Sequence, residues 1–187
     1  MPKNGGLDID FFLNRLALDE FADPYAIDPI EVLRRMFRFA EPNEMQDLFN
    51  NFCHAAMSDS YCWKEGSPGN LLFFSEKLEQ LIEAGYLIQS AKKKRRKKLK
   101  NRMRSIRVDH LPIDLTEREF AEPMLVFDRF FSYNSLAQWK LALHNWTAAA
   151  LANHSISESV EPFTIVPFVK HMEKLIAAAY WVMTLSQ

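Results

Sequence analysis

The chain contains one segment twice, and this repetition restricts the possible folds more than any other feature of the sequence. When the sequence is shifted by 94 positions, residues 28–88 align with residues 122–182 without a gap, and 14 of the 61 pairs are identical. Self-similarity at a fixed spacing indicates that one supersecondary unit was duplicated. A unit of about 60 residues buries only a modest core by itself. The sequence therefore predicts two similar halves that cover each other's apolar faces, related by a pseudo-two-fold axis.

The pattern inside each half predicts three helices. The chain has only 5 Gly among its 187 residues, with 48% hydrophobic content, which favours helices over sheets with many turns. The acid–Pro pairs Asp28-Pro29 and Glu122-Pro123 predict the first helix of each half, with Pro at the first helical position. Apolar residues at helical spacing predict the second helices at about 43–58 and 135–152, and the third at about 69–90 and 163–185.

Further helices are expected outside the repeated segments. Apolar residues at helical spacing predict one over about 8–21, and Thr116 with Glu119 forms a capping-box pattern that predicts a short one before the second half. The expected fold is all-α, with seven or eight helices in two tandem three-helix pseudo-repeats packed into one compact body. Its parts are an N-terminal helix and linker (1–27), a first repeat (28–91), a basic helix and linker (92–115) and a second repeat (116–187).

Charge is strongly segregated along the chain. Residues 92–107 carry 11 Lys or Arg and no acid, whereas the remainder has 12 basic and 24 acidic residues. Such a strip favours contact with a polyanion, because each neutralised nucleic-acid phosphate releases counterions. Non-specific phosphate contact with DNA or RNA is therefore one expectation, and a solvated charged helix without a ligand is the alternative. The contacting residues would be Lys92, Lys93, Lys94, Arg95, Arg96, Lys97, Lys98, Lys100, Arg102 and Arg104.

A protein partner is the alternative function. The third helix of the second half is apolar on nearly all sides around Tyr180, Trp181 and Met183. A helix of this kind is either buried or part of an interface. It predicts a homodimer or a partner surface if these side chains face outward.

Three polar positions are identical in both halves, one on each predicted helix. An Arg, an Asn and a Glu could meet between the helices as a buried structural network, because buried charges need partners. The alternative is a duplicated ligand site, in which Arg holds an anion and Glu acts as acid or base. No nucleophile accompanies the set, so we expect no catalytic residues and no enzyme activity. The positions are Arg35/Arg129, Asn51/Asn145 and Glu79/Glu173.

The sequence lacks the common motifs of catalytic and metal sites. The sequence contains no nucleotide-binding loop, hydrolase elbow or zinc-protease motif, and the two Cys are too few for a disulfide framework. We therefore expect no metal, no cofactor and a cytoplasmic location. No run of about 18 uncharged apolar residues occurs, so no membrane span is expected.

Overall fold

The computed structural model describes residues 27–90, 115–152 and 154–186, and every regular element in these ranges is helical. This confirms the predicted all-α fold. The predicted helix at 8–21 and the basic segment 92–107 lie outside the described residues. The elements are α3 (Pro29–Phe39), α4 (Pro42–Met57), α5 (Pro68–Ser90), α7 (Glu117–Ala121), α8 (Met124–Tyr133), α9 (Leu136–Leu151), the 3₁₀ turn η2 (Ile156–Glu158) and α10 (Pro162–Leu185).

The helices begin where the sequence places cap residues. The Asp28 side chain accepts a hydrogen bond from the Ile30 amide at 3.1 Å, and Pro29 follows as the first helical residue of α3. Such caps satisfy amides that the first helical turn leaves without partners. Thr116 begins α7 with the predicted capping box, and Ser135 begins α9 with another.

The predicted start of α8 is wrong by one residue, and the residue that caps the helix differs from the predicted one. Glu122 is the C-cap of α7, and its amide donates to the Arg118 carbonyl at 2.9 Å. Pro123 then serves as the N-cap of α8 instead of its first residue. The cause is α7 itself, because this short helix ends directly against α8 and takes Glu122 for its own terminus.

Helix bounds in the first half recur 94 residues later. A shift of 94 moves the bounds of α4 onto those of α9, and it moves the bounds of α3 and α5 onto those of α8 and α10 to within one residue. The two halves therefore carry the same helices in the same order. A two-fold relation between them stays a prediction.

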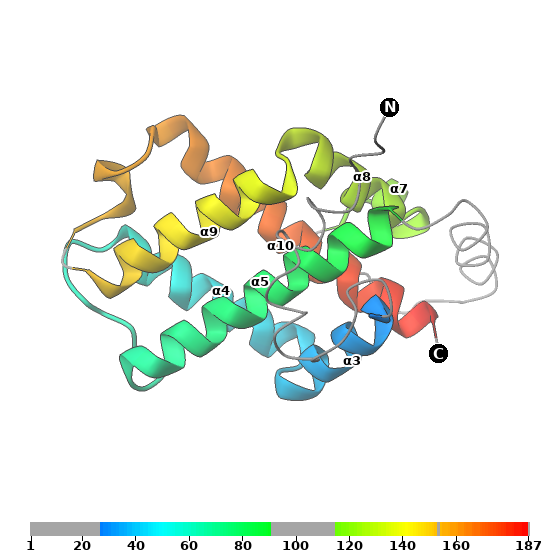
Figure 1. Ribbon diagram of the computed structural model, residues 1–187, viewed down its shortest axis with the longest axis horizontal. Helices are drawn as coiled ribbons and strands as arrows, with labels where there is room; N and C mark the ends of the chain where they lie inside the picture. The colour runs from blue at the N-terminus through cyan, green and yellow to red at the C-terminus, as the bar shows by residue number, and fades with distance from the viewer. Residues whose placement is uncertain (1–26, 91–114, 153, 187) are drawn as a thin grey trace, which may run out of the picture.

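The four long helices interleave the two halves. Each helix of the pair α4 and α5 packs against both α9 and α10. In Figure 1, α5 and α9 lie next to each other on the near side, with α4 and α10 behind them. The shorter α3 packs on α5 and α10, and α8 packs on α10 and α5. Most of the closely packed helix pairs thus join one half to the other, and the core belongs to both.

A glycine and a buried polar contact lie where the helices approach each other closely. The Cα of Gly85 on α5 faces α10 and α8, where an added Cβ would lie 3.3 Å from Leu175 and 3.4 Å from Phe127. Between α5 and α9, the buried hydroxyls of Ser75 and Thr147 share a hydrogen bond of 2.6 Å. This bond satisfies two polar groups inside the interface, as burial requires.

A candidate binding groove between α9 and α10

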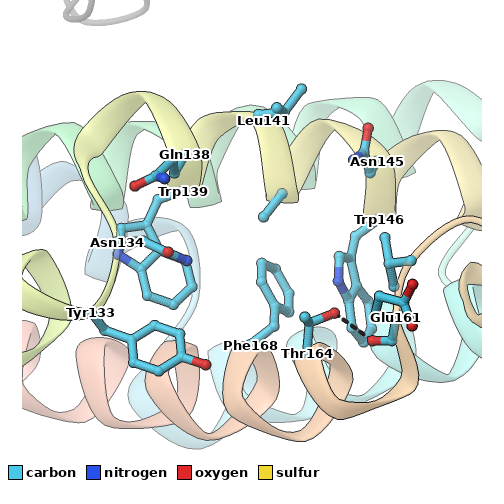
Figure 2. Close-up of a pocket in the computed structure, with 12 residues that line it drawn as sticks. Tyr133, Asn134, Gln138, Trp139, Leu141, Asn145, Trp146, Glu161, Thr164 and Phe168 are labelled. Carbon is cyan, nitrogen blue, oxygen red and sulfur yellow. Dashed lines mark hydrogen bonds between the residues drawn. The ribbon is translucent and has the colours of Figure 1, made fainter.

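An open groove of about 490 Å³ lies between α9 and the first turns of α10. Figure 2 shows its interior, where Trp146 extends from α9 toward α10 and Phe168 extends from α10 toward α9. The lining residues are Tyr133, Asn134, Gln138, Trp139, Leu141, Ala142, Asn145, Trp146, Val160, Glu161, Thr164 and Phe168. Concave surfaces of this size, mostly apolar with a few polar groups, are typical of ligand sites.

The inner wall of the groove is a stack of aromatic rings. Trp146 and Phe168 are stacked with centroids 4.5 Å apart, and Trp139 lies 6.2 Å from Phe168. The Trp139 indole N–H donates to the Phe130 carbonyl at 2.9 Å, so its polar atom is satisfied inside the protein. These contacts hold the rings in place, and the groove therefore exists before any ligand arrives.

Two of the four most exposed apolar side chains line this groove, and the other two lie on the adjoining first turns of α10. The four most exposed are Phe163 at 74%, Val166 at 64%, Leu141 at 61% and Tyr133 at 51%. Phe163 and Val166 belong to the first turns of α10, Leu141 to α9, and Tyr133 ends α8. Scattered exposed apolar residues are ordinary, but a cluster around a concavity marks an interaction site.

The polar groups of the groove are mostly neutral. Glu161 is the one charged side chain among the lining residues, and it is exposed. The Thr164 hydroxyl donates to the Glu161 carbonyl at 2.7 Å. Next to Tyr133, His171 is held against the aromatic rings, and burial lowers its pKa, with Lys174 acting in the same direction. A groove lined by apolar side chains and neutral hydrogen-bonding groups is better suited to binding a ligand than to acid–base catalysis.

Several of the repeated Arg, Asn and Glu positions have described contacts with residues outside this set. Arg129 pairs with Glu119 at 2.6 Å, and Glu173 pairs with Lys170 at 2.7 Å. On the first half, Asn51 donates to Glu65 at 2.8 Å, and Glu79 pairs with Lys140 at 2.9 Å. Asn145 lines the groove, and Arg35 is exposed on α3. The Arg–Asn–Glu network expected in each half stays a prediction.

A buried carboxylate, Glu119, organises the charges at the opposite end of α10. Both of its oxygens accept from Lys174, at 2.9 and 2.8 Å, and its side chain is 1% exposed. Burial alone would raise the pKa of Glu119, but hydrogen bonds from Lys174 and Thr116 lower it to about 2. The carboxylate thus stays charged and fixes α7 to α10.

A second cavity, of about 180 Å³, lies between α5 and α9. Lys140 at its edge pairs with Glu79 at 2.9 Å and donates a short hydrogen bond to Glu83, which is fully buried. The charges of Lys140, Glu79 and Glu83 therefore pair with one another and hold α5 to α9. Such pairing is typical of a structural ion cluster.

The cysteines do not form a metal site in the described ranges. The Cys62 sulfur lies 3.4 Å from Nδ1 of His54, whereas Cys53 is buried and its pKa is raised by burial and by Glu173. Among the residues that the structure describes, no three His, Cys, Asp or Glu side chains gather closely enough to hold a metal ion.

The predicted partner surface on α10 is wrong in its location. Trp181 and Met183 are buried, and Tyr180 is half-buried. Trp181 stacks on Phe120 with centroids 4.5 Å apart and donates to the Phe120 carbonyl at 3.1 Å. These side chains fill the interior, so they present no exposed patch. The apolar surface of α10 that reaches solvent is at its other end, around Phe163.

The groove itself was not predicted, although the sequence contains a signal for it. The two halves share no identical residue in the loop before the third helix, where Trp63 stands in one half and Ser157 stands 94 residues later. A missing large side chain at a repeated position indicates space. The predicted nucleic-acid residues of 92–107 lie outside the described ranges.

Comparison of the chain with models of protein families, with curated proteins and with solved structures finds no match. None of the helices in the described ranges has both the length and the apolar character needed to cross a bilayer.

Proposed function

We propose that the protein is a non-enzymatic binding module that docks a segment of a partner protein in the groove between α9 and α10. The observation that carries this proposal is that the groove is lined by two of the most exposed large apolar side chains of the described residues, Leu141 and Tyr133, beside the stacked rings of Trp146 and Phe168. A ligand lying in the groove would cover Leu141 and Tyr133, and a longer segment would extend over α10. Burial of apolar surface is the main favourable term in such association.

The proposal is tested by selecting binders from a library of random peptides displayed on phage. Binding of the selected peptides is then compared between the wild type, Leu141→Asp and Tyr133→Asp, since both side chains line the groove. Both side chains are exposed, so the substitutions leave the core intact. Leu141→Asp also introduces the residue that the first half already has, since Asp47 stands 94 positions earlier.

Leu72→Asp is the matched control, because Leu72 is exposed on α5 and is not among the residues that line the groove. We expect affinity to fall at least ten-fold in the two groove variants and to be unchanged in Leu72→Asp. If no peptide is selected, or if the selected peptides bind all three variants equally, the groove is not a docking site.

A second candidate function rests on the charge segregation of the sequence. Eleven cations within 16 residues, beside an acidic remainder, favour contact of residues 92–107 with nucleic-acid phosphates. Binding to a DNA duplex and to an RNA oligomer would be measured across a salt titration, with a variant in which the basic residues of 92–98 are changed to Gln. Affinity that falls steeply with salt in the wild type, and is lost in the variant, supports this function. Binding that survives the substitutions contradicts it.

A further inference from the structure

The first half of the protein contains a filled version of the same groove. Phe74 and Asn51 stand 94 positions before Phe168 and Asn145, which line the groove of the second half. In the first half, Trp63 covers this place: its ring is buried and stacks on Phe74 with centroids 6.1 Å apart. The loop that carries Trp63 thus occupies the position that is open in the second half.

Two hydrogen bonds hold the loop across the filled groove. The Asn51 amide donates to the Glu65 carboxylate at 2.8 Å, and the Asn70 amide donates to the Glu65 carbonyl oxygen at 3.2 Å. Asn70 stands 94 positions before Thr164, which also lines the open groove. The Trp63 ring, the Glu65 carboxylate and the Glu65 backbone carbonyl therefore contact three positions whose counterparts all line the open groove.

The second half leaves the groove open because its loop takes another path. Ile156 is fully buried, and η2 packs on α9 and α4 instead of crossing the groove. Ser157, the counterpart of Trp63, is exposed and cannot fill the space. On the wall of the groove, Ala142 replaces the larger Leu48.

The side-chain amide of Asn145 can form a hydrogen bond with a ligand in the groove. Asn145 is half-buried at the groove, and within the part of the chain that the structure describes its amide has no hydrogen-bond partner. The side-chain amide of its counterpart Asn51 donates a hydrogen bond to Glu65. An amide at this place in a half-buried groove favours a ligand that brings a carboxylate, since hydrogen bonds to charged groups are the stronger ones.

We infer that the groove recognises a protein segment with an aromatic residue followed two positions later by an acidic residue, bound as residues 63–65 are bound in the first half. The aromatic ring packs against Phe168, and the carboxylate accepts from Asn145. Within the described residues, the Trp63 indole N–H has no hydrogen-bond partner, so the filled groove holds the ring by packing alone. Phe and Tyr therefore also fit the aromatic position. This inference rests on the proposed function of the groove and specifies its ligand.

The probe is a fluorescein-labelled peptide with the sequence of residues 60–67 and Ser in place of Cys62, titrated with the full-length protein and followed by fluorescence anisotropy. Peptides with Trp63→Ala and Glu65→Gln are measured beside it. On the protein, Asn145→Ala tests the amide, and Asn50→Ala on the exposed side of α4 is the matched control. Circular dichroism verifies that each variant is folded.

We expect the Trp63→Ala peptide to bind at least ten-fold more weakly, because aromatic anchors dominate such interfaces. Glu65→Gln in the peptide and Asn145→Ala in the protein should each weaken binding about three-fold or more, and together no further, because they remove the same hydrogen bond. Absence of peptide binding, or binding indifferent to these changes, overturns the inference.

The peptide selection described above separates this failure from failure of the groove itself. Selected peptides that need Leu141 and Tyr133 but lack the aromatic–x–acidic pattern would overturn the inference and leave the proposed function standing. Selected peptides that share the pattern support both. If selection yields no groove-dependent peptide, both fail together.

Discussion

Tyr180 of the second half packs edge-on against Phe37 of the first half, with ring centroids 5.3 Å apart and ring planes at 72°. The counterpart contact, with the halves exchanged, joins Tyr86 to Phe131 at 5.5 Å and 75°. All four residues belong to pairs that are identical between the halves. The same contact thus fastens α10 to α3 and α5 to α8.

These two contacts should contribute equal coupling energies. Double-mutant cycles with Tyr180→Leu and Phe37→Leu, and with Tyr86→Leu and Phe131→Leu, should each give about 0.5–1.5 kcal/mol, as expected for edge-on aromatic pairs. The free energy of unfolding would be measured by urea denaturation. A cross pair, Tyr180→Leu with Phe131→Leu, serves as the control and should show additive effects. A large coupling in one cycle and none in the other would contradict equivalence.

Glu119 predicts a loss of stability in acid. Its pKa is lowered from 4.5 to about 2 in the folded protein, so the stabilisation is fully present above about pH 4.5. It is lost as the pH falls toward 2, because the unfolded state then binds the proton more readily, and the loss amounts to about 3 kcal/mol. Urea denaturation between pH 2 and 7 measures it.

Glu119→Gln should remove this part of the pH dependence. The variant should be less stable than the wild type at pH 7, and the difference should shrink toward pH 2. Glu117→Gln, in the same helix but exposed, should follow the wild-type profile. A wild-type profile shared by Glu119→Gln would show that the carboxylate is not responsible.

Lys140 should be one of the most sensitive charged positions. Lys140→Met removes an ammonium group from the fully buried Glu83 and from Glu79, and it should cost about 3–5 kcal/mol of unfolding free energy. Adding Glu83→Gln should restore part of the loss, since the buried charge is then gone. Lys170→Met, at a pair whose lysine is largely exposed, should cost less than about 1 kcal/mol. Thermal denaturation followed by circular dichroism would rank the variants, and equal losses for both lysines would contradict the interpretation.

Trp63 should matter for its ring and not for its indole nitrogen. Trp63→Ala leaves a cavity against Phe74 and should cost about 3–5 kcal/mol. Trp63→Phe keeps most of the stack and removes an N–H that is buried without a partner in the described ranges, so its cost should be within about 1–2 kcal/mol. Urea denaturation compares the two. A loss for Trp63→Phe as large as for Trp63→Ala would show that the nitrogen has a role.

Most of the fold was predictable because its signals are local. The second helices were expected at about 43–58 and 135–152 and occupy Pro42–Met57 and Leu136–Leu151. Proline, cap residues and a regular apolar stripe act within one or two turns, so they can be read without knowledge of the partners. The start of α8 was predicted one residue too early because Glu122 is the C-cap of α7, the helix directly before it.

The polar contacts were not predictable from the repeat. Arg129 and Glu173 are identical to their counterparts, but identity does not say with which residues they pair. Their partners Glu119 and Lys170 are not conserved between the halves: Glu119 precedes the repeated segment, and Lys170 corresponds to Glu76. Comparison of the halves identifies residues that are the same in both. These ion pairs also need partner residues that occur in one half only.

The groove follows the same rule. It arises from differences between the halves: Ser157 for Trp63, Ala142 for Leu48, and a buried Ile156 that draws the loop elsewhere. Each change is small in sequence, and their combined effect appears only when the loop and both helices are placed in space. The identical positions show how the body is built, whereas the differing ones open the groove.

The interleaving of α4 and α5 with α9 and α10 has a consequence for the covalent connection between the halves. The contacts among these four helices join one half to the other, so they would be available equally to two separate polypeptides. A chain cut between residues 90 and 115 would keep every one of these partners, and reassembly of the fragments would be bimolecular instead of intramolecular. The covalent connection would then matter less for which helices meet than for how fast they find one another.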